Sequence, residues 1–111
     1  MVFVMHPLDR LYDQVLARKN ADPQRSYTAK LFREGVAKCA KKVGEEGVEV
    51  AIAAISGDKR ERVAESADLL YHLAVLWVAA DIDPQEIYAE LAARENRSGL
   101  DDKAARKGVV K

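Results

Sequence analysis

One stretch decides the fold, Leu69-Leu-Tyr-His-Leu-Ala-Val-Leu-Trp-Val-Ala-Ala80, because it is apolar around the whole circumference of a helix. A helix without a polar face has to be covered on every side. The stretch contains His72 and is too short to cross a bilayer, which takes about 20 apolar residues. Since a small chain has little core of its own, we expect a second subunit to complete this cover. The stretch therefore predicts a helical protein that forms at least a homodimer.

Local signals on either side of this stretch predict four to five helices. Apolar residues recur with helical spacing, so helices are expected over residues 7–16, 36–55, 59–80 and 84–94, with a short helix through Leu31 and Phe32 that ends near Gly35. Ser26 or Thr28 can cap the second helix. Asp58 and Asp83 each precede a Glu by three residues, which is the spacing of a capping box. No segment alternates as a strand would.

The predicted fold class is therefore all-α, a helical bundle of four to five helices completed by dimerisation. Residues 1–95 would form the helical domain, and residues 96–111 a polar C-terminal tail of the same domain. Because the tail mixes charged residues with Gly99 and Gly108, we expect it to be mobile or to lie on a neighbouring subunit.

Composition argues against several classes of function. The 111 residues include 18 Lys plus Arg and 18 Asp plus Glu, so no net charge draws the chain to nucleic acid or a membrane surface. The single cysteine, Cys39, cannot form an intramolecular disulfide or a cysteine-based zinc site. Residues 1–5 are too short for the apolar region of a signal peptide, so a cytoplasmic protein is expected.

Acidic side chains recur one turn apart on two consecutive predicted helices. They are Glu45, Glu46 and Glu49 on the helix over residues 36–55, and Glu65 and Asp68 on the next helix. The connection at Ser56-Gly57 is short, so the two helices should pack antiparallel and bring the acids together. Both sets lie beside apolar positions and not on a purely polar face.

Carboxylates gathered beside apolar surface indicate a metal ion. Like charges in a partly dry site repel unless a cation joins them or their pKa values rise. Mg²⁺ prefers oxygen ligands and combines few carboxylates with substrate phosphates. We therefore expect Mg²⁺ at Glu46, Glu49, Glu65 and Asp68. The alternative is a solvated acidic face supported by nearby lysines.

Basic residues close to the acids can contact phosphate oxygens. These residues are Lys30, Arg33, Lys38, Lys41 and Lys42, for which ordinary exposure to solvent is the alternative. His72 either donates to a carboxylate or is a satisfied core histidine beneath the acids. Cys39 and Trp77 are interpreted as packing residues.

The acids resemble the signature of the all-α nucleotide pyrophosphohydrolase superfamily, Glu-Glu-x-x-Glu followed by Glu-x-x-Asp. Within it, the chain is more closely similar to the phosphoribosyl-ATP pyrophosphatase family. Four segments carry this likeness: Ser26-Tyr-Thr-Ala-Lys-Leu-Phe32, Lys41-Lys-Val-Gly-Glu-Glu46, Asp68-Leu-Leu-Tyr-His-Leu73, and Arg97-Ser-Gly-Leu-Asp-Asp-Lys103 with Arg106. The resemblance covers residues 6–107.

The resemblance implies hydrolysis of phosphoribosyl-ATP to phosphoribosyl-AMP and pyrophosphate. The four acids expected to bind Mg²⁺ would hold one or more ions against the triphosphate, and water would attack in line. Glu45 would orient or deprotonate that water, or bridge a second metal ion. The implied substrate contacts, some of them from a neighbouring subunit, are Ser26, Tyr27, Thr28, Lys30, Lys41, Lys42, Arg97, Lys103 and Arg106.

Two positions depart from the pattern of the family. Gly47 stands where a small residue, usually Ala, is expected, and glycine inside a helix costs about 1 kcal/mol relative to Ala. Asp102 stands where Glu is usual. The family also occurs fused to a cyclohydrolase with a cysteine-rich zinc site, which a chain with only Cys39 cannot contain.

Three other functions fit part of the sequence. A pyrophosphohydrolase that clears noncanonical nucleoside triphosphates would share the acids but not the segments around Tyr27 and His72. A di-iron bundle wants Glu-x-x-His on two helices, whereas here Glu65 is followed by Asp68. A non-enzymatic oligomerisation module would explain the apolar helix but leave the acids without a role.

Overall fold

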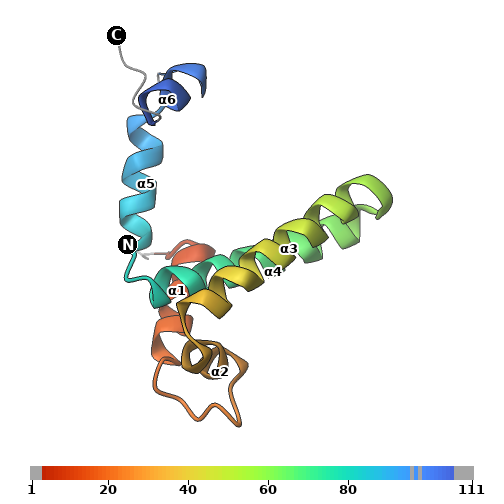
Figure 1. Ribbon diagram of the computed structural model, residues 1–111, viewed down its shortest axis with the longest axis vertical. Coiled ribbons are helices and arrows are strands. Elements are labelled where there is room, and N and C mark those ends of the chain that lie inside the picture. Colours follow the sequence, from red (N-terminus) through yellow and green to blue (C-terminus); the bar gives the residue numbers. More distant parts are fainter. Residues whose placement is uncertain (1–3, 96, 98, 107–111) are drawn as a thin grey trace.

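The computed structural model describes residues 4–95, 97 and 99–106, and every regular element in these ranges is an α-helix. The helices are α1 (Pro7–Ala17), α2 (Tyr27–Glu34), α3 (Val36–Ser56), α4 (Lys59–Ala79), α5 (Pro84–Ala93) and α6 (Gly99–Arg106). α3 and α4 form a long antiparallel hairpin, and α1 and α2 pack on it at the end away from its turn (Figure 1). The all-α prediction is confirmed.

Side-chain caps begin the helices where the sequence predicts. Ser26, and not Thr28, caps α2, because its hydroxyl accepts a hydrogen bond from the Ala29 amide at 3.1 Å. At α5 the capping box is complete, with the Glu86 carboxylate accepting from the Asp83 amide at 2.9 Å. At α4 the structure shows half of the predicted box, in which the Asp58 carboxylate accepts from the Glu61 amide at 2.9 Å.

Two residues with positive φ set the directions of the helices. Gly35 separates α2 from α3 with a φ of 97°, in the left-handed region that only glycine enters without strain. Asp81 follows α4 with a φ of 59°, which Asp tolerates better than most residues. α5 then leaves at 108° to α4 and stands away from the hairpin (Figure 1).

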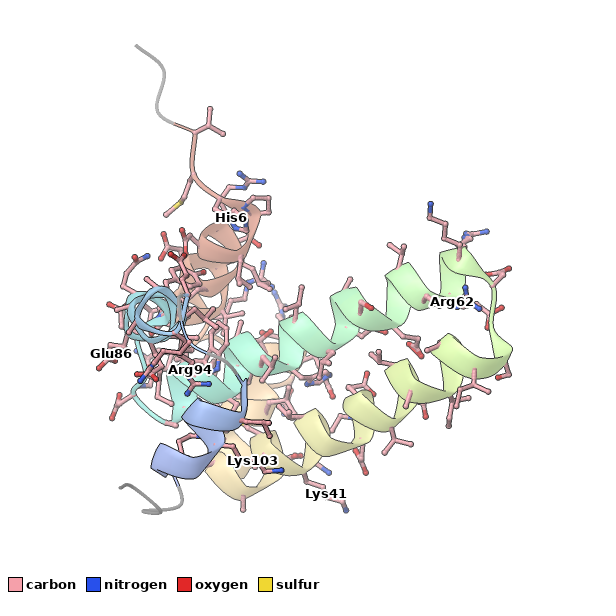
Figure 2. All side chains as sticks on the ribbon, turned by 90° about the horizontal axis from the view of Figure 1, so that it is seen from above. His6, Lys41, Arg62, Glu86, Arg94 and Lys103 are labelled. Carbon is pink, nitrogen blue, oxygen red and sulfur yellow. The ribbon has the colours of Figure 1, made fainter. Side chains whose placement is uncertain are left out.

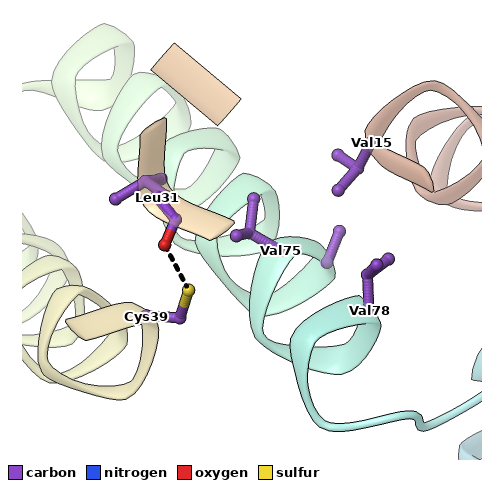
Figure 3. Close-up of a cluster of buried hydrophobic side chains, with 6 residues drawn as sticks. Val15, Leu31, Cys39, Val75 and Val78 are labelled. Atoms are coloured by element: carbon purple, nitrogen blue, oxygen red, sulfur yellow. Dashed lines mark hydrogen bonds between the residues drawn. The ribbon is translucent and has the colours of Figure 1, made fainter. Parts of the chain in front are cut away.

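The core lies where α1, α2, α3 and α4 meet (Figure 3). Its buried members are Val15 from α1, Leu31 from α2, Cys39 from α3, and Ala74, Val75 and Val78 from α4. The Cys39 thiol donates to the Leu31 carbonyl oxygen at 3.5 Å, so this cysteine is a packing residue as predicted. The chain's own helices therefore cover one side of the apolar stretch, while Leu70 on another side is 43% exposed.

The molecule is more open than a compact monomer of its size. Its radius of gyration is 16.6 Å, whereas a compact chain of this length has about 13 Å. Its accessible surface is 8236 Å², whereas a folded monomer of this mass has about 6,100 Å². Part of the difference comes from α5 and α6, which project from the bundle (Figure 1). α6 lies in the predicted polar tail, where the charged composition and the glycines gave no reason to expect a helix.

No single helix in the described ranges is both long and apolar enough to cross a membrane. The pair formed by α4 and α5 meets these criteria only in combination, with the 108° bend between them.

Candidate active site

The turn between α3 and α4 sets the register of the acidic residues. A Cβ atom on Gly57 would lie 2.9 Å from the Ala53 carbonyl oxygen, so this close approach requires glycine. The Arg62 side chain donates to the same oxygen through Nε at 3.2 Å. These contacts hold the start of α4 against the end of α3, and the Glu pairs of the two helices lie further along the hairpin.

Three of the four predicted metal ligands, Glu46, Glu49 and Asp68, act electrostatically on the fourth, Glu65. Burial raises the pKa of Glu65 above its ordinary value, and a hydrogen bond with Asp68 and the negative charges of Asp68, Glu49 and Glu46 raise it further. Glu46 and Glu65 are half-buried, whereas Glu49 and Asp68 are exposed. The structure therefore brings together the four carboxylates, two from each helix.

A cleft of 310 Å³ opens beside these acids between α3 and α4. It is lined by Glu49, Ile52, Ala53, Ser56, Glu61, Ala64 and Glu65. Within the described ranges, no three His, Cys, Asp or Glu side chains are grouped tightly enough to hold a metal ion.

Glu45 pairs with a lysine on its own helix. The Lys42 Nζ lies 3.4 Å from the Glu45 Oε1, one turn apart on α3. The neighbouring Tyr27 phenol raises the pKa of Lys42, and a hydrogen bond with Glu45 raises it further. An ammonium group and a carboxylate thus lie together at the side of the cluster nearest to α2.

His72 lies beneath the acids and is 6% exposed. Its Nε2 is 4.0 Å from the Glu46 Oε1, and its buried Nδ1 has no hydrogen-bond partner among the described residues. Burial lowers the pKa of His72, and the opposing charge of Glu46 does not overcome that effect. His72 is therefore a buried core residue that faces a carboxylate. The prediction of a satisfied core histidine is not met at Nδ1, which has no hydrogen-bond partner among the described residues.

The segment predicted to contact substrate divides into buried and exposed parts. Ser26 and Thr28 are 8% and 7% exposed. Ser26 caps α2, and the Thr28 Oγ1 lies 2.5 Å from the Tyr71 hydroxyl. Tyr27 lies between them and is 51% exposed. Of the three residues, Tyr27 is the one that offers surface to a ligand.

Tyr71 is the site residue to which the sequence argument assigned no role. Its ring centroid lies 4.9 Å from that of His72 and 6.5 Å from that of Tyr27. It therefore links the buried histidine to the exposed tyrosine, and its hydroxyl anchors Thr28. In the sequence, Tyr71 is marked only by its position beside His72 in the Asp68–Leu73 segment. That position alone gives no physical reason for a role, because the role depends on how α2 packs against α4.

The basic residues predicted to bind phosphate lie in three places. Lys41 projects outward from α3 (Figure 2), and Lys30 is exposed on α2. Arg97 and Arg106 lie near Glu90 of α5, whose pKa they lower together with the stronger effect of Arg94. α6, which carries Lys103, lies beyond the far end of α5 and away from the hairpin (Figure 1). Within one chain, the bend after α4 thus separates the tail from the acids.

A larger hollow of 620 Å³ lies elsewhere, between the N-terminal segment, α1 and the start of α5. Among the residues that the structure describes, its ionisable lining consists of His6, Asp9, Tyr12, Asp13 and Asp83. A wall with three carboxylates and no lysine or arginine repels a polyphosphate unless cations intervene. The acids of α3 and α4, with Lys42 beside them, are the better candidate for nucleotide chemistry.

Comparison with known proteins shows the family to which the chain belongs. Residues 8–95 match the model of the phosphoribosyl-ATP pyrophosphohydrolase family. A phosphoribosyl-ATP pyrophosphatase from Azospirillum brasilense is 59% identical over 100 residues, covering 90% of each chain. One from Parvibaculum lavamentivorans is 60% identical over 99 residues, covering 89% of this chain and 91% of the relative. One from Paracoccus denitrificans is 49% identical over 104 residues, covering 92% and 96%. The matched range contains all five predicted catalytic acids, and the chain belongs to the phosphoribosyl-ATP pyrophosphohydrolase family.

Proposed function

We propose that this protein hydrolyses phosphoribosyl-ATP to phosphoribosyl-AMP and pyrophosphate, the second step of histidine biosynthesis. The observation that carries the proposal is the pairing of α3 with α4, which places Glu49 and Glu65 on the lining of one cleft, with Glu46 and Asp68 close to Glu65. The relatives named phosphoribosyl-ATP pyrophosphatase, at up to 60% identity along nearly the whole chain, support the choice of substrate.

Mg²⁺ is the cofactor that suits these residues. Four carboxylates from two helices crowd one region, and repulsion disfavours full ionisation of Glu65. An oxygen-preferring divalent cation relieves that repulsion, so the donor set fits Mg²⁺. Glu46, Glu49, Glu65 and Asp68 would hold it. When bound, it would neutralise phosphate charge and stabilise the leaving pyrophosphate.

The remaining chemistry belongs to the side chains around the four acids. Water attacks in line, its oxygen bonds to phosphorus, and the anhydride bond between the α- and β-phosphates breaks. Glu45 orients the water or accepts its proton, and its contact with Lys42 holds the carboxylate in place. Lys42, with Lys30 and Lys41, supplies positive charge to the phosphates.

The working form is proposed to be a homo-oligomer, at least a dimer. The accessible surface exceeds that of a compact monomer by about 2,100 Å², an amount comparable with what a subunit of an obligate dimer buries. Val48, Ile52 and Ile55 follow one face of α3 and are 58%, 52% and 87% exposed. We propose that a second copy covers this α3 stripe, and that Arg97, Lys103 and Arg106 of the tail contact the substrate of a neighbouring subunit. We place the protein in the cytoplasm, without nucleic-acid or membrane partners.

The test is pyrophosphate release from phosphoribosyl-ATP by the purified chain, with and without Mg²⁺, and with ATP and dCTP as control substrates. The proposal requires magnesium-dependent release from phosphoribosyl-ATP alone. Release mainly from ordinary or modified triphosphates would replace it with a role in clearing such nucleotides. If the folded protein releases pyrophosphate from none of these nucleotides, the remaining interpretation is a non-enzymatic helical binding module.

A further inference from the structure

Three aromatic rings form a connected group at the edge of the acidic cluster. Tyr71 and His72 are in edge contact, with centroids 4.9 Å apart and planes at 78°. Tyr27 meets His72 edge-on, with centroids 6.1 Å apart and planes at 89°, and its plane lies within 23° of that of Tyr71. The group runs from the buried His72 under Glu46 to Tyr27, which is half in solvent.

The backbone on both sides of Tyr27 is held in place. Ser26 caps α2 through its hydroxyl, and Thr28 is bonded to Tyr71 of α4. Since Ser26 and Thr28 are both buried, the segment cannot shift without breaking these contacts. The exposed ring between them is therefore fixed in advance, and a ligand that stacks on it would lose little entropy in ordering it.

Tyr27 lies next to the charged side chains of the acidic cluster, so its ring could contact the base of a nucleotide whose phosphates bind there. Tyr27 is beside Lys42, which contacts Glu45, and it touches His72, which faces Glu46. A phosphate chain bound at the acids would thus lead towards this ring. Stacking on an aromatic ring suits the planar base of a nucleotide, because every base has a π face.

We infer that Tyr27 forms the base subsite, stacking on the adenine ring of the substrate and separating nucleotides from bare polyphosphates. This inference rests on the proposed function and adds which part of the substrate the residue contacts. The face of the Tyr27 ring recognises the base, and the phenol hydroxyl contributes little to that recognition.

The experiment compares the wild-type protein with Tyr27→Phe, which keeps the ring, and Tyr27→Leu, which keeps apolar bulk without a π face. The KM and kcat for phosphoribosyl-ATP are measured, together with the inhibition constant of tripolyphosphate, which has no base. Tyr27→Leu should raise KM about tenfold with kcat within about twofold, and leave the inhibition constant of tripolyphosphate unchanged. Tyr27→Phe should behave as the wild type. Circular dichroism and thermal melting confirm that each variant is folded.

Three results would overturn the inference. An unchanged KM in Tyr27→Leu would mean that the base does not touch the ring. An equal rise in KM and in the inhibition constant of tripolyphosphate would place Tyr27 with the phosphates. Equal losses in Tyr27→Phe and Tyr27→Leu would assign the effect to the hydroxyl.

The proposed function can fail separately. If wild-type protein releases no pyrophosphate from phosphoribosyl-ATP, calorimetric binding of ATP and of tripolyphosphate to the same three proteins decides the inference instead. Stacking then predicts that Tyr27→Leu weakens ATP binding about tenfold and tripolyphosphate binding not at all. Equal effects on both ligands, or none on ATP, would reject it.

Discussion

The Thr28 Oγ1 lies 2.5 Å from the Tyr71 hydroxyl, and this hydrogen bond joins α2 to α4 across 43 residues of sequence. Thr28 is 7% exposed, so water cannot readily replace the partner if it is removed. The contact holds Tyr27 beside His72, and through them it connects the packing of α2 to the acidic cluster on α3 and α4.

Replacing Tyr71 by Phe should lower the free energy of unfolding by about 1–2 kcal/mol, because the buried Thr28 hydroxyl loses its partner. Urea denaturation monitored by circular dichroism measures the change. Tyr27→Phe removes a hydroxyl from an exposed ring and should change stability by less than about 0.5 kcal/mol. Equal stability of Tyr71→Phe and the wild type would show that the contact does not hold the two helices together.

Glu46→Gln and Asp68→Asn should each fold normally and lose at least about a hundredfold in kcat/KM, because each removes a negatively charged oxygen donor from the proposed Mg²⁺ site. Pyrophosphate release at saturating Mg²⁺ measures the loss, and the melting temperature checks the fold. Glu34→Gln alters an exposed carboxylate at the end of α2 and should retain wild-type activity. Full activity in both site variants would remove the metal-site proposal.

Glu65→Gln should raise the melting temperature in EDTA and reduce the further rise that Mg²⁺ produces. The reason is that Asp68, Glu49 and Glu46 disfavour the Glu65 charge in the metal-free protein, whereas the cation would favour it. Differential scanning fluorimetry over a range of Mg²⁺ concentrations gives both quantities, since a ligand of the folded state raises its stability. A magnesium response equal to that of the wild type would show that Glu65 is not a ligand.

Tyr88 should make stability fall at high pH. Burial and the hydrogen bond that its hydroxyl donates to the Asp9 Oδ1 at 2.9 Å raise the pKa of Tyr88 to about 12. The unfolded chain has the ordinary value near 10, so the folded state favours the neutral phenol. That stabilisation is complete below about pH 10 and declines as the pH rises through 12.

Melting temperatures of the wild type and Tyr88→Phe between pH 8 and 11 test this sign. The difference in melting temperature between the wild type and Tyr88→Phe should become smaller above pH 10, because the variant has no phenol to ionise. A difference in melting temperature that stays constant from pH 8 to 11 would contradict the raised pKa of Tyr88.

The double variant Val48→Lys with Ile55→Lys should dissociate the proposed oligomer. Both residues are more than half exposed, at 58% and 87%, and lysine is a good helix former, so each subunit should still fold. Light scattering coupled to size-exclusion chromatography measures the mass. Leu16→Lys, at a 46% exposed position on α1, serves as the matched control. A double variant that keeps the mass of the wild type would exclude the α3 stripe as the contact.

Most of the helices could be predicted because their signals are local. The predicted helix over 36–55 appears as Val36–Ser56, and the predicted stop at Gly57 is where a Cβ atom would meet the Ala53 carbonyl. Caps such as Ser26 and Asp83 act on amides two or three residues away, so they work before any tertiary contact forms. Helix α6 was missed because only Leu100, Ala104 and Ala105 of its eight residues are apolar, too few for a helical pattern to stand out.

The pairing of the acids across the hairpin could also be predicted from the sequence. A short turn between two helices requires antiparallel neighbours, and spacing along each helix then places Glu46 and Glu49 opposite Glu65 and Asp68. Asp68, Glu49 and Glu46 lie close enough to Glu65 to raise its pKa, but no three acids in the described ranges are grouped tightly enough to hold a metal ion. Their role as magnesium ligands stays a prediction.

Local signals in the sequence were enough to predict the all-α class, most helix boundaries and the meeting of acids across one hairpin, because each depends on contacts within a few residues or across one turn. Three features come from the packing of distant helices: which side of the Leu69–Ala80 stretch is covered, the hydrogen bond between Thr28 and Tyr71, and the exposure of Tyr27 between buried neighbours. The direction of α5 was also decided at that level, through the positive φ of Asp81. These features depend on how helices distant in sequence cross, and such angles are set by the packing of whole faces and not by local spacing.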